Sequence, residues 1–391
     1  MGNRALFITR HNPSTNGGGN FASRAFLEAV SATFKSKVTL FVSSDFDESV
    51  LINKPDEIIK VKKRHSLDAI AGLLRGKLTR FEKSVESWLK SNDVSNFEWV
   101  FLDGGIIGGS YVKKFKDKDI KTCTIHHNFE VEYHIDNKSL ETFKGRVKYW
   151  IKKLEQSAYK NSNVNLFLTE DDLRKFENYY GKHAMNFELG CFEFPVPTQS
   201  LVNSDYYPNK LLDTKQNYIK AVISGSLNTV QTLSSFKWFL EHIYPLILNA
   251  YPNFSLTLTG RSPTEEIIAL CDNFNVTLIS SPIDIRAVIS EHHLYICPIK
   301  LGGGLKLRVM DAIAIGMPCL IQSNSFRGYE VFDTTGIVLK YNDEKDFMSA
   351  FNILINRIIK DRSDSSADLR QQYELKFSFL AGRKRLENIL R

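Results

Sequence analysis

The sequence lacks long apolar runs and paired cysteines. The five cysteines of the 391-residue chain are scattered and form no C-x-x-C pair: Cys123, Cys191, Cys271, Cys297 and Cys319. This pattern argues against a disulfide framework or a cysteine zinc site and favours buried thiols in a reducing compartment. No stretch approaches the roughly 18–20 consecutive apolar residues of a membrane span. The first residues also lack the apolar core of a secretory signal, so we expect a cytoplasmic protein.

The sequence has neither a short internal repeat nor a low-complexity tract. Apolar residues make up 43% and charged residues 24% of the chain, as in soluble globular proteins, and the length predicts two to three domains. The net charge of +7 is uneven, because residues 60–90 hold nine basic and three acidic side chains. A solvated helix face and peripheral contact with an anionic membrane both explain this excess. We expect no nucleic-acid partner, because the segment has neither interleaved aromatic residues nor a recognisable module.

Short apolar segments alternate with helical patterns along the chain, which predicts βαβ units and parallel sheets. In the second half we predict strands at 218–226, 254–260, 276–280, 294–299, 319–323 and 336–341, and helices at 232–252, 264–275, 283–293 and 344–359. In the first half we predict strands at 4–10, 37–44, 97–105, 121–127 and 164–169, and helices at 21–34, 78–91, 145–162 and 171–180. The prediction is an α/β chain of two Rossmann-like domains, with a proline-bearing linker at 192–210 and one long C-terminal helix. Because α/β sheets bind ligands at the carboxyl ends of their strands, we expect the ligand in a cleft between the domains.

A glycine turn with two nearby cations follows the strand at 294–299. Residues 302–304 are all glycine, and Lys306, Arg308 and Asp311 follow within a predicted helix that Gly316 ends. A helix N-terminus is already positive, so two cations there favour a bound anion such as a diphosphate. The alternative is a tight turn in which Arg308 pairs with Asp311 on a solvated helix face.

The segment GGGLKLRVMDAIAIGMPCL (302–320) resembles the signature of retaining GT-B glycosyltransferases, above all family 4 and the group 1 enzymes. The resemblance implies that Lys306 and Arg308 bind the diphosphate of a nucleotide-sugar donor and that Asp311 binds the ribose. The backbone of Gly303, Gly304 and Leu305 would line the same site. Commoner members carry a second glutamate where this sequence has Gly303, so a catalytically inactive nucleotide-sugar-binding protein is one alternative function.

Three further segments match the family in order. VISGSLN (222–228) would bring Gly225 and Ser226 to the phosphates, and LTLTGRS (256–262) would place Gly260 and Arg261 beside the nucleotide. HNPSTNGGGN (11–20) resembles the acceptor-side glycine loop, with Gly18 and Gly19 as candidate binding residues. Its spacing does not fit the dinucleotide G-x-G-x-x-G fingerprint.

The segment TIHHNFEVEYH (124–134) resembles the family's HN-x-E motif, which faces the donor sugar. We predict His127 as the catalytic, sugar-facing histidine, with His126 as the alternative if the strand register shifts by one. A metal site of His127, Glu130 and His134 is a further possibility, as is a strand-end histidine bonded to the backbone. We predict no metal site.

These observations together predict a glycosyltransferase that moves a sugar from a nucleotide-sugar to a hydroxyl of a glycan or lipid-linked acceptor, in surface polysaccharide or glycoconjugate synthesis. The D-x-D motif of metal-dependent GT-A enzymes is absent, so we expect catalysis without metal and without a cofactor. The resemblance implies that the reaction retains configuration. The resemblance implies domains at 1–198 (acceptor) and 199–363 (donor), with 364–391 crossing back to the first domain. A nucleotide-sugar epimerase has a similar fold, but its acid/base carboxylates cannot be assembled here.

Overall fold

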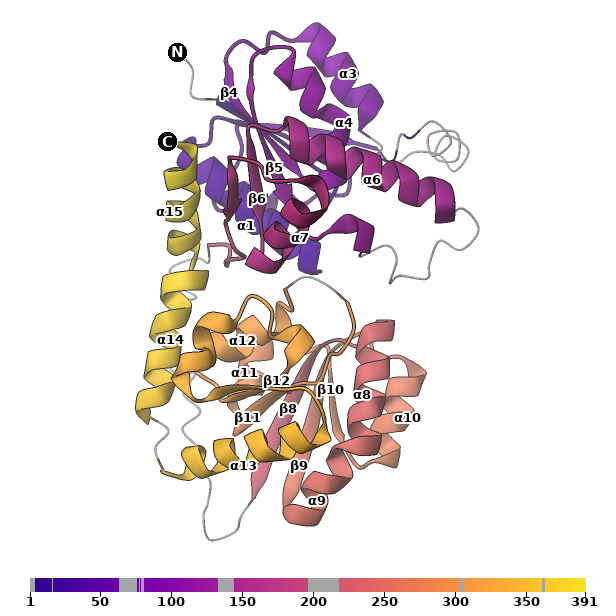
Figure 1. Ribbon diagram of the computed structural model, residues 1–391, viewed down its shortest axis with the longest axis vertical. Helices are drawn as coiled ribbons and strands as arrows, with labels where there is room; N and C mark the ends of the chain where they lie inside the picture. Colours follow the sequence, from indigo (N-terminus) through magenta and orange to yellow (C-terminus); the bar gives the residue numbers. More distant parts are fainter. Residues whose placement is uncertain are drawn as a thin grey trace. The chain divides into compact units, whose positions relative to one another are not determined.

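The computed structural model describes residues 4–15, 17–62, 76, 78, 81–132, 144–195, 218–302, 305–360 and 363–391. The chain divides into two units: unit 1 is Met1–Pro197 with Phe377–Arg391, and unit 2 is Thr198–Lys376. Each unit contains one parallel sheet with helices packed on it (Figure 1), which confirms the prediction of two Rossmann-like domains. No helix in the described ranges has the length and apolar character needed to span a bilayer.

The sheet of unit 1 has the strand order β3-β2-β1-β4-β5-β6-β7. Its strands are β1 (Arg4–Thr9), β2 (Val38–Ser43), β3 (Glu57–Val61), β4 (Phe97–Asp103), β5 (Lys121–His126), β6 (Val164–Phe167) and β7 (Asn186–Glu188). Its helices are α1 (Gly18–Thr33), α3 (Glu82–Ser91), α4 (Gly105–Lys116), α6 (Lys144–Asn161), α7 (Glu170–Tyr180) and α15 (Phe379–Leu390), with a 3-10 turn at Glu48–Val50.

Alternate residues of β1 face opposite sides of the sheet, as the twofold period of a strand requires. Ile8 belongs to a core cluster with Tyr111 of α4 on one face. Phe7 stacks on Phe101 of β4, and the same Phe101 ring contacts Phe34, which follows α1. The central strands β1 and β4 are therefore buried on both faces, which explains why they appear in the sequence as nearly continuous apolar runs.

Helix α4 was not predicted, because its glycines argue against a helix when only propensity is considered. A Cβ atom at Gly109 would lie 2.1 Å from the carbonyl oxygen of Leu154 in α6, and one at Gly108 would lie 2.7 Å from Cβ of Ala158. The glycines thus let α4 and α6 pack closely, side by side in Figure 1. Close packing between the two helices compensates for the helix stability that glycine residues cost.

The sheet of unit 2 has the strand order β10-β9-β8-β11-β12-β13. Its strands are β8 (Ile219–Ser226), β9 (Phe254–Arg261), β10 (Thr277–Ser280), β11 (Leu294–Cys297), β12 (Cys319–Gln322) and β13 (Val338–Tyr341). Its helices are α8 (Val230–His242), α9 (Tyr244–Ala250), α10 (Glu265–Asn273), α11 (Ile285–Ser290), α12 (Arg308–Ala314), α13 (Glu344–Lys360) and α14 (Ser363–Phe377). Short 3-10 turns occupy Ser323–Ser325 and Glu330–Thr335.

Two predicted long helices are each divided in two. The helix predicted at 232–252 separates at Ile243 into α8 and α9, and Pro245 lies in the first turn of α9, where proline is tolerated. The predicted C-terminal helix separates at Ser378, whose side chain accepts a hydrogen bond from the backbone N–H of Ala381 and caps α15. Helix α15 packs against α1 within unit 1.

Candidate functional site

The carboxyl ends of β8 and β9 lie side by side in unit 2, and both carry residues predicted to bind the donor. In the parallel register Gly225 lies opposite Gly260, and Ser226 lies opposite Arg261. A Cβ atom at Gly260 would lie 1.8 Å from the carbonyl oxygen of Gly225, and its φ of +155° is in the region that favours glycine. Only glycine lets the two strand ends approach this closely.

Arg308 joins this edge of the sheet to the start of α12. Its guanidinium donates to the carbonyl oxygen of Ser224 at 3.1 Å and to Oγ1 of Thr232 at 3.2 Å. It also lies directly above Gly225, where a Cβ atom would come within 2.3 Å of Cζ. The predicted residues Gly225, Gly260 and Arg308 are therefore brought together, and Thr232 is a contact that the sequence did not indicate.

Lys306 lies over the glycine turn itself. Its Nζ donates to the carbonyl oxygen of Gly302 at 2.7 Å, and its own carbonyl oxygen accepts from the hydroxyl of Tyr329 at 2.9 Å. Gly302 has a φ of +86°, and a Cβ atom there would meet Nε2 of Gln231 in the first turn of α8. Leu305 is half-buried in this turn. The other predicted residues of the turn, 303 and 304, lie outside the described ranges.

Asp311 pairs with a residue that the sequence analysis missed. Its Oδ1 lies 3.1 Å from Nε of Arg286 in α11, and both side chains are about one-third exposed. Arg308 is bonded instead to Ser224 and Thr232. The alternative of a simple Arg308–Asp311 turn is therefore not the arrangement seen, and Arg286 orients the carboxylate predicted to bind ribose.

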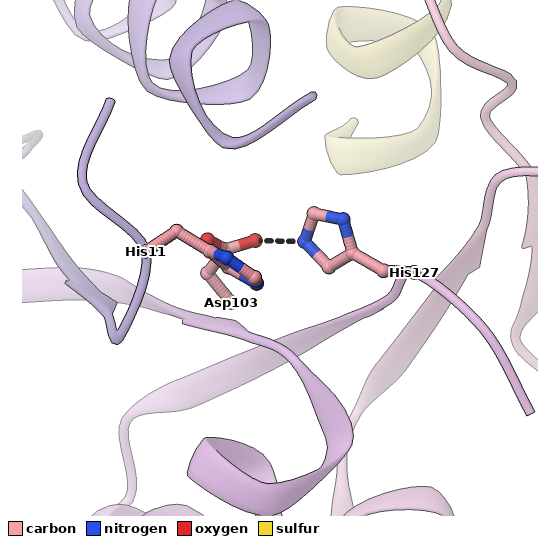
Figure 2. Close-up of side chains that lie close together, drawn as sticks. All are labelled: His11, Asp103 and His127. Carbon is pink, nitrogen blue, oxygen red and sulfur yellow. Dashed lines mark hydrogen bonds and ion pairs between the residues drawn. The ribbon is translucent and has the colours of Figure 1, made fainter. Parts of the chain in front are cut away.

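A second polar cluster lies in unit 1, at the carboxyl ends of β1, β4 and β5 (Figure 2). Nε2 of His127 lies 2.5 Å from Oδ1 of Asp103, and ligand atoms of His11, Asp103 and His127 all lie within 4.8 Å of one another. His127 is 5% exposed and Asp103 is fully buried. The bond to Asp103 shows that His127 is not a strand-end histidine satisfied by the backbone, so that alternative is wrong.

Asp103 is held as a carboxylate by its surroundings. Its Oδ2 accepts from the hydroxyls of Thr9 at 2.6 Å and Ser23 at 2.5 Å. Burial acts to raise the pKa of Asp103, but the charge and hydrogen bond of His127 outweigh burial and lower it to about 2. A carboxylate fixed by three donors holds the His127 ring in one orientation, because it accepts the N–H of Nε2.

His11 completes the cluster, and the predicted glycines make room for it. A Cβ atom at Gly19 would lie 2.6 Å from Cε1 of His11, while Gly18 is the first residue of α1. Burial, with the nearby His127 as a second cause, lowers the pKa of His11 to about 4, so its ring is neutral at physiological pH. Glycine at position 19 therefore serves the placement of an imidazole.

His126 is not part of this cluster, unlike His127. Its Nε2 is 3.1 Å from Oδ1 of Asn165, and its ring stacks on Phe167. Burial lowers the pKa of His126 to about 4, as expected for a neutral histidine in the core. The register that favours His127 for the polar cluster is the one observed.

The three-residue cluster differs from the metal site considered from the sequence. Glu130 accepts from Arg10 at 3.2 Å and is bonded through its backbone N–H to Glu155, and residue 134 lies outside the described ranges. Zinc bonds of about 2.0–2.1 Å in a tetrahedron place two ligand atoms about 3.3 Å apart. The 2.5 Å contact between His127 and Asp103 is too short for that geometry and fits a hydrogen bond.

Two sequence predictions fall largely on residues that the structure does not describe. Most of the basic segment 60–90 belongs to the gaps at 63–75, 77 and 79–80, and most of the linker 192–210 lies in the gap at 196–217. Their proposed roles stay predictions.

The sequence itself matches a known family. The family described as "Glycosyl transferases group 1" matches residues 220–357, which lie in unit 2. A 44.6 kDa protein in the cps region of Klebsiella pneumoniae is 29% identical over 97 residues, a match that spans 23% of this chain and 25% of that protein.

Solved structures match over nearly the whole chain. Sucrose-phosphate synthase from Thermosynechococcus elongatus has a TM-score of 0.69 at 13% identity and covers 100% of this chain and 98% of its own. Anabaena HepE in complex with UDP has a TM-score of 0.68 at 10% identity and covers 99% of both chains. WaaG, a glycosyltransferase involved in lipopolysaccharide biosynthesis, has a TM-score of 0.65 at 13% identity, with 98% of this chain and 99% of its own covered.

The shared architecture is the GT-B fold. Residues 220–357 match the group 1 glycosyltransferases, and the fold of the chain agrees with that match, as the sequence predicted.

Proposed function

We propose that the protein transfers a sugar from a UDP-sugar to a hydroxyl of a glycan or lipid-linked acceptor, with retention of configuration and without a metal ion. One observation carries the proposal: Arg308 lies over Gly225, beside the strand end at Gly260, and Lys306 lies over Gly302 of the glycine turn, all inside the segment that matches the family.

The chemistry of the donor explains why this cluster matters. A nucleotide-sugar releases a diphosphate, and the negative charge that develops on it must be stabilised in the transition state. Fixed cations do this without a metal, and glycines let the phosphates approach backbone N–H groups closely. Lys306 and Arg308 would take this role, and Asp311, oriented by Arg286, would accept hydrogen bonds from the ribose hydroxyls.

The identity of donor and acceptor is inferred from the relatives. HepE was crystallised with UDP and with UDP and glucose, and a structure from E. coli is described as bound with UDP-2-fluoro glucose. WaaB is described as a lipopolysaccharide outer core galactosyltransferase, and the Klebsiella relative lies in a cps region. These descriptions support UDP as the nucleotide and a surface polysaccharide or glycolipid as the product.

Nucleotide binding and turnover test the proposal in two steps. UDP should raise the melting temperature more than GDP or ADP, because a ligand at a hundred times its Kd adds about 2.7 kcal/mol to the unfolding free energy. Mass spectrometry should then detect transfer from a UDP-sugar to acceptor glycans. Binding of UDP-sugars without any transfer would indicate an inactive binding protein, and conversion of one UDP-sugar into its epimer would indicate an epimerase.

The place of action belongs to the same proposal. A lipid-linked acceptor would put the enzyme at the cytoplasmic face of the membrane, where each basic residue near anionic lipid contributes about 1 kcal/mol. Sedimentation with phosphatidylglycerol vesicles, at low and high salt, measures this contact. A protein that stays in the supernatant at low salt would favour a soluble acceptor and a solvated basic segment.

A further inference from the structure

We propose that His11 is a further sugar-binding residue: its imidazole, held between Gly19 and the Asp103–His127 pair, forms a hydrogen bond with a sugar hydroxyl. The inference rests on the proposed glycosyltransferase function, and the sequence predicted only His127 as a sugar-facing histidine.

The position of His11 supports this role. His11 follows β1, Asp103 ends β4 and His127 follows β5, and these three strands are neighbours in the sheet. Ligands of parallel α/β sheets bind at this edge. His127 and Asp103 are almost completely buried, whereas His11 is partly exposed and thus forms the accessible side of the cluster.

The ring of His11 is held in place, but its nitrogens have hydrogen-bonding capacity left within the described part of the chain. Its backbone N–H donates to Oγ1 of Thr9 at 3.0 Å, and Gly19 provides the space for the ring. Within the described part of the chain, the ring nitrogens form no hydrogen bond, although they lie within 4.8 Å of Asp103 and His127 ligand atoms. A held imidazole with open nitrogens is suited to an external partner.

The charge of the ring selects the chemistry of that partner. Burial and the neighbouring His127 and Arg10 lower the pKa of His11, and the raising effects of Asp103 and Glu130 do not compensate. The neutral ring has one donor and one acceptor nitrogen, which matches a hydroxyl group. A phosphate would instead favour a cationic ring, so a sugar hydroxyl fits better than the diphosphate.

Two variants test the role of the ring. His11→Ala removes it, and Gly19→Ala displaces it because the new Cβ would lie 2.6 Å from Cε1. Gly145→Ala is the matched control, since a Cβ there meets nothing within 4 Å. We expect both test variants to lose about tenfold in kcat/KM with a UDP-sugar while keeping the wild-type Kd for UDP. His11→Gln should recover part of the loss, because an amide also donates and accepts.

Nuclear magnetic resonance of the ¹⁵N-labelled imidazole gives a readout independent of turnover. UDP-glucose, UDP-galactose or UDP-N-acetylglucosamine should shift the His11 resonances, and UDP alone should not. A shift that requires a glycan acceptor with UDP would assign the hydroxyl to the acceptor and still support the proposal. Equal shifts with UDP alone, no shift with any sugar, or wild-type kcat/KM in His11→Ala would overturn it.

Two further outcomes separate this inference from its alternatives. Cobalt(II) that binds the wild type with d–d absorption bands, and loses them in His11→Ala, would make the cluster a metal site and overturn the sugar role. Failure of the wild type to bind any nucleoside diphosphate would refute the proposed function. A His11 resonance that still shifts with free sugars in that case would keep the sugar contact.

Discussion

Lys306→Ala tests the donor site most directly. In the structure the ammonium of Lys306 lies 2.7 Å from the carbonyl oxygen of Gly302, above the glycine turn. A charged hydrogen bond to a phosphate contributes about 1.5–3 kcal/mol, so its loss should weaken UDP binding by about 10- to 150-fold. The unfolding free energy should fall by only about 1 kcal/mol, because the side chain is partly exposed.

Isothermal titration calorimetry with UDP at two salt concentrations measures this effect. The wild-type affinity should weaken as salt is added, and the variant should respond less, because one cation has been removed. Lys340→Ala is the matched control, since Lys340 is an exposed cation of the same unit that pairs with Asp333 on the surface. Equal Kd values for UDP, GDP and ADP in wild type and Lys306→Ala would refute the assignment of this turn to the diphosphate.

Four further predictions address metal use, pH dependence, packing and thiols. Sugar transfer should survive excess EDTA, and a loss that Mn²⁺ restores would contradict a reaction that relies on fixed cations. The unfolding free energy should fall as the pH drops from about 6.5 towards about 4, because His11 and His126 become protonated in the unfolded state but stay neutral in the folded state. Urea titrations across this pH range should show a smaller fall for His11→Gln than for the wild type. Gly316→Ala should lower the unfolding free energy by about 1–3 kcal/mol, because φ is +73° and the new Cβ would lie 2.6 Å from the carbonyl oxygen of Ser366; a wild-type melting temperature would contradict this strain. All five cysteines are buried, so a thiol reagent should react only after denaturant is added, and rapid labelling of the native protein would exclude this packing.

The elements that the sequence predicted best are those whose local pattern agrees with their environment. The strands of unit 2 are short apolar runs bounded by turn residues, and each was found within a few residues of its observed limits. Helix α4 was missed because its glycines oppose helix formation locally. The structure shows why glycine is present: the backbone of Leu154 in α6 approaches α4 too closely for a side chain at position 109. The break at Ile243 depends on one proline whose effect on a long amphipathic pattern is local.

Some residues of the candidate site could also be predicted from local sequence, and others could not. Lys306, Arg308 and the glycine turn were identified because they are contiguous and carry a recognisable pattern. Asp103 lies two residues before the end of the strand predicted at 97–105 and is followed by glycine, a signal that could have placed it at the binding edge of the sheet. Asp311 and Arg286 lie on two different helices, so no sequence pattern in either helix predicts that they pair.

The sequence by itself predicted the two parallel sheets and the motifs of the segment that matches the group 1 glycosyltransferases, because periodicity and contiguous motifs are local properties. The tertiary structure alone decided that His127 rather than His126 meets Asp103, that His11 stands beside them, and that Gly19 provides the room. These choices depend on which strands become neighbours and which side of each strand a residue faces. Contacts between residues far apart in the sequence, such as His11 and Asp103, are set by packing and leave no trace in local sequence.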